Sequence, residues 1–196
     1  MNLKKLSLNE EVKLIKKFIG LNEGSKDDMG FFDVEETESI PTNILIGDSQ
    51  TPYVDINTTK ASRISSVGGE SSLWLGGMGV PWLIGALNKY PKVEKSVKNV
   101  ITVIGTNGNF GKVFNDDIGA LFSAIKSKFP KANILVVQGS WGWGGLKNTT
   151  EQQVRRYYKK FENLGGTLIE PPIGNIEPHQ DHPNYAKIGA ELDSIL

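Results

Sequence analysis

The chain has 196 residues and no net charge, because 22 lysines and arginines offset 22 aspartates and glutamates. This length suits a single large domain, and the charge balance is unlike that of a nucleic-acid binder. The absence of cysteine excludes a disulfide scaffold, a cysteine-ligated metal site and a thiol nucleophile. Glycine, with 22 residues, exceeds its usual share of ~7% and gathers mostly in residues 68–111 and 139–145, which also hold all four tryptophans.

The first 41 residues are predicted to form an amphipathic helix followed by an acidic linker. A capping-box pattern at residues 7–10 precedes apolar residues at helical spacing, and Gly20 supplies a stop signal. Residues 21–41 are rich in aspartate and glutamate. We expect the helix to pack on its own domain or, as the alternative, to contact an assembly partner.

Residues 42–196 are predicted to form one domain in which apolar strands alternate with helices. The strands are expected at residues 43–46, 99–104, 133–137 and 167–169, with a further short strand near 64–67, and the helices at 80–90, 116–128, 150–163 and 184–194. Continuous apolar strands separated by helices predict a three-layer α/β/α sandwich around a mostly parallel sheet. In such a sheet the ligand site lies beyond the carboxyl ends of the strands.

Polar and glycine-rich segments follow the predicted strands at this edge. Gly47-Asp48-Ser49-Gln50 follows the first strand, Gly105-Thr106-Asn107 follows a middle strand, and residues 139–145 follow the next one. The only two histidines, His179 and His182, come after the last strand. A hydroxyl nucleophile, a base and several N–H donors are the components of an acyl-transfer site. Ser140 also follows a strand, but no base pattern accompanies it.

These motifs, in this order, resemble the SGNH (GDSL-type) hydrolases, which are esterases and lipases on a flavodoxin-like sheet. The resemblance covers about residues 42–196 and implies that Ser49 is the nucleophile, with its own N–H in the oxyanion hole. It further implies that Gly77 supplies a backbone N–H, that Asn107 supplies a side-chain N–H, and that His182 is the base. Neutral acyl-transfer chemistry needs such donors, because a buried alkoxide without them is prohibitively costly.

The acid of the site departs from the family pattern. His179 stands three residues before His182, where the family has an aspartate. Three arrangements therefore stay open: Asp181 orients His182, Glu177 orients His179 as the base, or a backbone carbonyl orients the histidine of a Ser-His dyad. Gly108 also replaces an aspartate that is common after the family's asparagine.

The sequence predicts an esterase that removes a small acyl group, such as acetate, from a carbohydrate. Asp48, Gln50, Trp141 and Trp143 are predicted to contact this substrate, the tryptophans by stacking on sugar rings. We expect no metal, no organic cofactor and no nucleic-acid partner. The alternative is a non-catalytic carbohydrate-binding or structural module, because the motifs also look similar to SGNH proteins carried by bacteriophage particles.

The predicted location is cytoplasmic or virion-associated. The opening residues lead into a charged helix, and no stretch of about 18 apolar residues occurs anywhere in the chain. We therefore expect neither a signal peptide nor a membrane span.

Overall fold

A five-stranded parallel sheet forms the centre of the domain. The computed structural model describes residues 41–63, 72–142, 144–170 and 185–196. Contacts divide the chain into two units, Met1–Glu38 and Ser39–Leu196, and the described residues belong to the second. The predicted helix and linker of residues 1–41 lie almost entirely outside the described residues, so that assignment stays a prediction.

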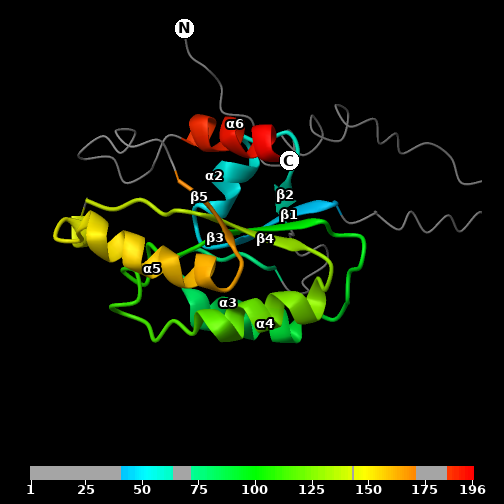
Figure 1. Cartoon of the computed structure of the whole chain (residues 1–196), viewed down its shortest axis with the longest axis horizontal. Helices are drawn as coiled ribbons and strands as arrows, with labels where there is room; N and C mark the ends of the chain where they lie inside the picture. Colours follow the sequence, from blue (N-terminus) through cyan, green and yellow to red (C-terminus); the bar gives the residue numbers. More distant parts are fainter. Residues whose placement is uncertain (1–40, 64–71, 143, 171–184) are drawn as a thin grey trace, which may run out of the picture. The chain divides into compact units, whose positions relative to one another are not determined.

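The strands lie in the order β2-β1-β3-β4-β5, and every neighbouring pair is parallel (Figure 1). Their bounds are Asn43–Gly47 for β1, Ser62–Arg63 for β2, Asn99–Val103 for β3, Asn133–Val137 for β4 and Thr167–Ile169 for β5. The four apolar runs in the sequence thus became β1, β3, β4 and β5. β2 is the edge strand beside β1, whereas residues 64–67, where the sequence predicted a further short strand, lie outside the described part of the chain.

Alternate residues of the strands face two separate cores. Ile44 and Ile46 of β1 pack with the helices on one face, while Leu45 packs with those on the other. The same alternation continues through β3 and β4, because successive side chains of a strand point to opposite faces. Burial on both faces explains why the strands are continuously apolar.

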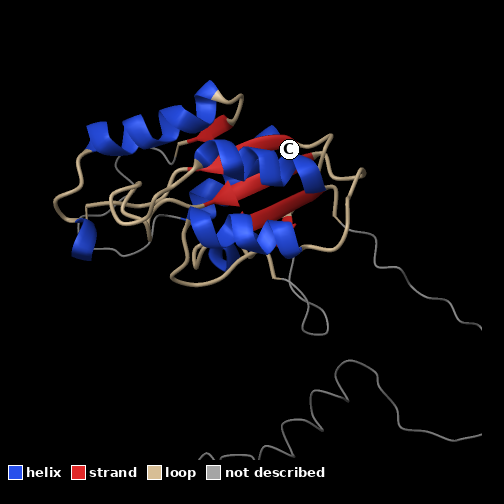
Figure 2. Cartoon of the chain, turned by 90° about the horizontal axis from the view of Figure 1, so that it is seen from below, coloured by secondary structure: helices blue, strands red, loops and turns tan. Residues whose placement is uncertain are grey.

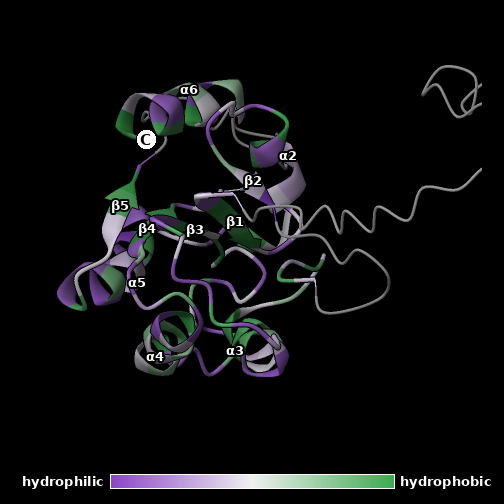
Figure 3. Ribbon diagram, turned by 90° about the vertical axis from the view of Figure 1, so that its right-hand side faces the viewer, coloured by the Kyte–Doolittle hydropathy of each residue, from purple (hydrophilic) through white to green (hydrophobic). Residues whose placement is uncertain are grey.

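Helices cover both faces of the sheet and complete the three layers (Figures 2 and 3). On one face lie α2 (Thr51–Asp55) and α6 (Tyr185–Ile195), and on the other lie α3 (Val80–Lys89), α4 (Ile118–Lys128) and α5 (Glu151–Asn163). The predicted α/β/α sandwich with a parallel sheet is therefore confirmed. A 3-10 turn at Gly144–Leu146 precedes α5.

Local signals in the sequence set the beginnings of the helices. The carboxylate of Asp117 accepts the N–H of Ala120 at 2.8 Å and caps α4. This cap explains why α4 begins at residue 118 rather than at the predicted 116. Proline stands in the first turn of both α2 and α3, where its missing N–H costs nothing.

Tyr158 of α5 joins the ends of two neighbouring strands. Its hydroxyl donates to the carbonyl oxygen of Ile104 and accepts the N–H of Gly139, both at 2.7 Å. The side chain is fully buried. This bridge fixes α5 to the carboxyl edge of the sheet, which is the edge where the sequence predicts the site.

Candidate active site

Ser49 lies in the turn that leads from β1 into α2. Gly47 ends β1 with a φ of 143°, and a side chain at this position would collide with the carbonyl oxygen of Val103. The turn closes where Oδ1 of Asp48 accepts the N–H of Gln50 at 2.9 Å. Asp48 and Gln50 are buried, whereas Ser49 is half-buried. The turn therefore leaves the serine more accessible than either neighbour.

The glycine loop that precedes α3 lies beside this serine. Residues 73–75 pair with the end of β1 through two backbone hydrogen bonds to Gly47, 2.9 and 3.1 Å long. A side-chain Cβ at Gly76 would lie 3.7 Å from the Cβ of Ser49. The next residue, Gly77, has a φ of 75°, and apart from its two chain neighbours no heavy atom of the described residues lies within 4 Å of the place where its Cβ would be. Gly76 therefore lies beside Ser49, and a side chain at Gly77 would meet no other part of the described chain.

Asn107 reaches the same glycine loop from the end of β3. Its Nδ2 donates to the carbonyl oxygen of Met78, which directly follows Gly77, at 3.1 Å. One N–H of the amide is used in this bond, and an asparagine amide carries two. Ser49 and Asn107, 58 positions apart in the sequence, thus both lie beside the loop of residues 76–78.

Thr106, which is not among the predicted site residues, connects the loops that follow three strands. Its hydroxyl accepts Nε2 of Gln50 at 3.0 Å and donates to the carbonyl oxygen of Ser140 at 3.3 Å. All three residues are buried. A polar residue directly after an apolar strand was the available signal, but its partners become visible only in the folded chain.

Two of the predicted substrate contacts are inaccessible. Asp48 is 1% exposed and Gln50 is 5% exposed, and both side chains bond within the turn or to Thr106. Their burial indicates that they shape the serine turn instead of contacting a substrate. Trp141 is half-buried and packs in part against the core, and its indole N–H has no partner among the described residues. Trp143 lies outside those residues.

The carboxyl group of Asp48 is held in an unusual environment. Burial raises the pKa of Asp48 to about 7, although the hydrogen bond from the N–H of Gln50 acts in the opposite direction. Its Oδ2 has no hydrogen-bond partner in the described part of the chain. A neutral carboxyl group is therefore favoured at this position in mildly acidic solution.

The predicted bases and acids lie outside the described residues. These are Glu177, His179, Asp181 and His182. The residues that are described contain no group of histidine, aspartate and glutamate side chains that could hold a metal ion. Within the same residues, every helix is too short or too polar to cross a membrane.

Comparison with known proteins gives matches among solved structures. No protein-family model matches the sequence, and no curated protein matches it significantly. A Streptococcus pneumoniae protein provisionally described as a platelet activating factor is 14% identical, and the match covers 96% of this chain and 93% of that one with a TM-score of 0.59.

Two further matches carry the name of one family. A member of the lipolytic protein G-D-S-L family from Veillonella parvula is 14% identical over 79% of this chain and 97% of its own, with a TM-score of 0.54. A Desulfitobacterium hafniense protein, provisionally described as a lipolytic protein of the G-D-S-L family, is 13% identical over 79% of this chain and 98% of its own, with a TM-score of 0.52.

These matches identify the fold as that of the SGNH (GDSL-type) hydrolases, as the sequence resemblance implies. At this level of identity, the chemistry has to be argued from the residues of the site. Association with a phage particle stays a prediction.

Proposed function

We propose that this chain is a serine esterase in which Ser49 is the nucleophile. The observation that carries the proposal is that Ser49 and Asn107 lie beside one glycine loop, residues 76–78, at the carboxyl edge of the sheet. A hydroxyl group next to backbone and amide N–H donors suits attack on an ester carbonyl, since the negative charge that develops on oxygen needs such donors.

The start of α6 supports a histidine base. Tyr185, three positions after His182 in the sequence, begins α6 and stacks on Tyr53 of α2 with ring centroids 5.2 Å apart. Because α2 begins two residues after Ser49, this contact brings the start of α6 next to the helix that follows the serine. A Ser-His pair requires the segment that carries the histidine to lie near the serine in this way.

In the proposed reaction, the hydroxyl oxygen of Ser49 attacks the carbonyl carbon while His182 or His179 accepts its proton. The N–H groups of Ser49, Gly77 and Asn107 stabilise the oxyanion. Collapse of the intermediate breaks the ester bond, and the imidazolium protonates the departing alcohol. Water, deprotonated by the same histidine, then attacks the acyl-serine and releases the carboxylic acid, which restores Ser49.

We propose a small acyl group on a carbohydrate as the substrate. Support comes from Trp141, a half-buried indole that follows β4 at the same edge of the sheet as Ser49. A partly exposed indole can stack on a sugar ring. Trp141→Phe should therefore raise the KM for an acetylated oligosaccharide and leave the KM for p-nitrophenyl acetate, which has no sugar, unchanged.

The decisive experiment compares p-nitrophenyl acetate turnover by the wild type with that of Ser49→Ala. Turnover should be lost in the variant because no hydroxyl group remains to form the acyl-enzyme. Asn107→Ala should lower kcat by about 100- to 1000-fold, which is the usual effect of deleting one oxyanion donor. A fluorophosphonate should label the wild type on the peptide that contains Ser49.

Ser140→Ala provides a matched serine control, since Ser140 also follows a strand of the sheet but is fully buried. It should retain turnover. Equal rates for the wild type and Ser49→Ala would exclude Ser49 as the nucleophile. No turnover and no labelling of the wild type would instead favour the non-catalytic module. Among His179→Ala and His182→Ala, the variant that loses activity identifies the base.

A further inference from the structure

Asn107 belongs to a tightly turned loop whose backbone is strained. Shortly after it, Asn109 and Phe110 have φ values of 45° and 50°, in the left-handed region that residues other than glycine rarely adopt. The loop closes on itself, because the N–H of Asn109 donates to Thr106 and that of Phe110 donates to Gly105, both at 2.9 Å. Such strain persists only where the surrounding structure holds it in place.

Besides backbone hydrogen bonds within the loop, which include one from the N–H of Lys112 to the carbonyl oxygen of Asn109 at 3.2 Å, Asn109 has polar contacts with the start of α5 and the residues just before it. Nε2 of Gln153 donates to the carbonyl oxygen of Asn109 at 3.1 Å and also lies 3.4 Å from its Oδ1. The hydroxyl of Thr149 donates to the same Oδ1 at 2.8 Å. Both the carbonyl oxygen and Oδ1 of Asn109 therefore accept hydrogen bonds from this segment, and Gln153 donates to each of them.

The side chain of Phe110 is fixed by the same helix. It is buried, and its ring lies edge-on to Tyr157 and Tyr158, with centroids 5.8 and 6.0 Å away. Both strained residues of the loop thus depend on α5 for their surroundings.

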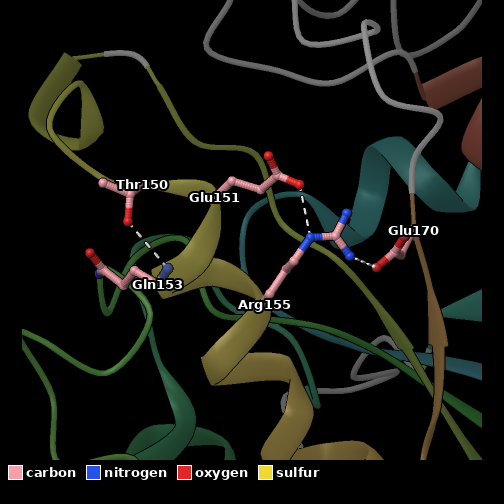
Figure 4. Close-up of polar contacts among 5 residues, drawn as sticks. All are labelled: Thr150, Glu151, Gln153, Arg155 and Glu170. Atoms are coloured by element: carbon pink, nitrogen blue, oxygen red, sulfur yellow. Dashed lines mark hydrogen bonds and ion pairs between the residues drawn. The ribbon is translucent and has the colours of Figure 1, made fainter.

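Gln153 is itself held in position. Its backbone N–H donates to the hydroxyl of Thr150, which caps α5, at 3.2 Å (Figure 4). Arg155 bonds both Glu151, at 2.8 Å, and Glu170 after β5, at 3.2 Å (Figure 4). These contacts connect the first turn of α5 to the end of β5. They therefore fix the position from which Gln153 contacts the loop.

We propose that Gln153 is a positioning residue for the amide of Asn107. The proposal rests on the proposed function, in which that amide donates to the oxyanion. Asn107 lies two residues before Asn109 in the same closed turn, so a change in the Asn109 backbone reorients the amide. Because an oxyanion donor acts only at the correct distance and angle, a small displacement has a large effect on rate.

Gln153→Glu tests this role while keeping the size of the side chain. A carboxylate cannot donate, and it would face the two acceptor oxygens of Asn109. The kcat for p-nitrophenyl acetate should fall about 10- to 100-fold with KM nearly unchanged. Gln152→Glu is the matched control, because the exposed neighbour on the same helix undergoes the same change of charge. It should keep the wild-type kcat.

Hydrogen exchange gives a readout that does not depend on activity. The amides of Asn109 and Phe110 should exchange faster in Gln153→Glu than in the wild type or in Gln152→Glu, while circular dichroism shows a folded protein. The proposal would be overturned if these amides exchanged in Gln153→Glu at the wild-type rate. It would also be overturned if the wild type were active and Gln153→Glu had the same kcat. If the wild type has no turnover, the proposed function fails and the catalytic role of Gln153 fails with it, whereas faster exchange would still show that Gln153 holds the loop.

Discussion

Asp48 and Ser49 are neighbours in the sequence, yet they occupy opposite environments. Successive residues leaving a strand point in opposite directions, so Ser49 remains partly accessible while Asp48 is buried. One oxygen of the Asp48 carboxyl group accepts the Gln50 N–H, and the other has no partner among the residues that the structure describes. The motif made Asp48 a candidate for substrate contact, but its burial became visible only in the structure.

The raised pKa of Asp48 predicts a pH dependence of stability. An aspartate with a pKa of about 7 in the folded state and near 3.8 when unfolded binds its proton more tightly in the folded state. The stability that it contributes is therefore complete below about pH 4 and is lost as the pH rises to about 7. In chemical denaturation, Asp48 should contribute more to the free energy of unfolding at pH 5 than at pH 8.

Asp48→Asn isolates this contribution. The amide oxygen can still accept the N–H of Gln50, and the side chain no longer titrates. The difference in the free energy of unfolding between pH 5 and pH 8 should therefore be smaller in the variant by the contribution of Asp48. Unfolding curves at a series of pH values measure this difference. A wild type and a variant with parallel pH profiles between pH 4 and pH 8 would contradict the assigned pKa.

At the scale of elements, an asparagine begins each of three neighbouring strands, at the end of the sheet opposite the site. Asn43, Asn99 and Asn133 lie in register across β1, β3 and β4. Nδ2 of Asn133 donates to Asn99 at 3.1 Å, and Nδ2 of Asn99 donates to Asn43 at 2.8 Å. Nδ2 of Asn43 ends the series on the carbonyl oxygen of Lys60, at 2.8 Å.

This asparagine ladder predicts a position-dependent loss of stability. Asn99→Ala removes the central member and with it two hydrogen bonds, each of which contributes about 0.5–1.5 kcal/mol to stability. Asn133→Ala removes only one bond at an exposed end and should cost less. Urea denaturation of both variants measures the difference, and equal losses would show that the ladder does not act as a connected unit.

The elements that the sequence predicted well are the ones whose burial is uniform. The runs that became β1, β3 and β4 are apolar on both faces, so composition alone reveals them. The five-residue α2 is too short for a helical period to appear, and β2 has only two polar residues. Both are set by tertiary contacts, so α2 could not be predicted from the sequence, and the strand predicted near 64–67 lies outside the described residues.

At the scale of the whole molecule, parallel topology made the candidate site predictable. Because the carboxyl ends of parallel strands meet at one edge, residues as distant as Ser49 and Asn107 could be assigned to one place from the order of the elements. The supporting residues could not be found in this way. Gln153 and Thr106 act through partners from other elements, and nothing in their local sequence distinguishes them from ordinary polar positions.

One carboxylate of the C-terminal helix makes several hydrogen bonds to the segment after α2. Asp193 of α6 accepts hydrogen bonds from the backbone N–H and the hydroxyl of Thr59, from the hydroxyl of Thr58 and from the N–H of Lys60. These bonds, led by that from the Thr58 hydroxyl, lower the pKa of Asp193 to about 2. Thr58 and Asp193 are more than 130 residues apart in the sequence, so this contact joins distant parts of the chain.

The lowered pKa means that Asp193 stabilises the docked helix at neutral pH and that this contribution is lost as the pH falls from about 4 to about 2. Asp193→Ala should therefore increase hydrogen exchange in α6 at pH 7, whereas α4, whose Asp117 cap is untouched, should exchange as in the wild type. Glu191→Ala removes an exposed acid from the same helix, and hydrogen exchange in α6 should stay as slow as in the wild type. Because Tyr185 at the start of α6 stacks on the helix that follows Ser49, looser docking should also lower the turnover expected from the proposed function. Unchanged exchange of α6 in Asp193→Ala would show that the apolar contacts of Ile188 and Leu192 hold the helix without the carboxylate.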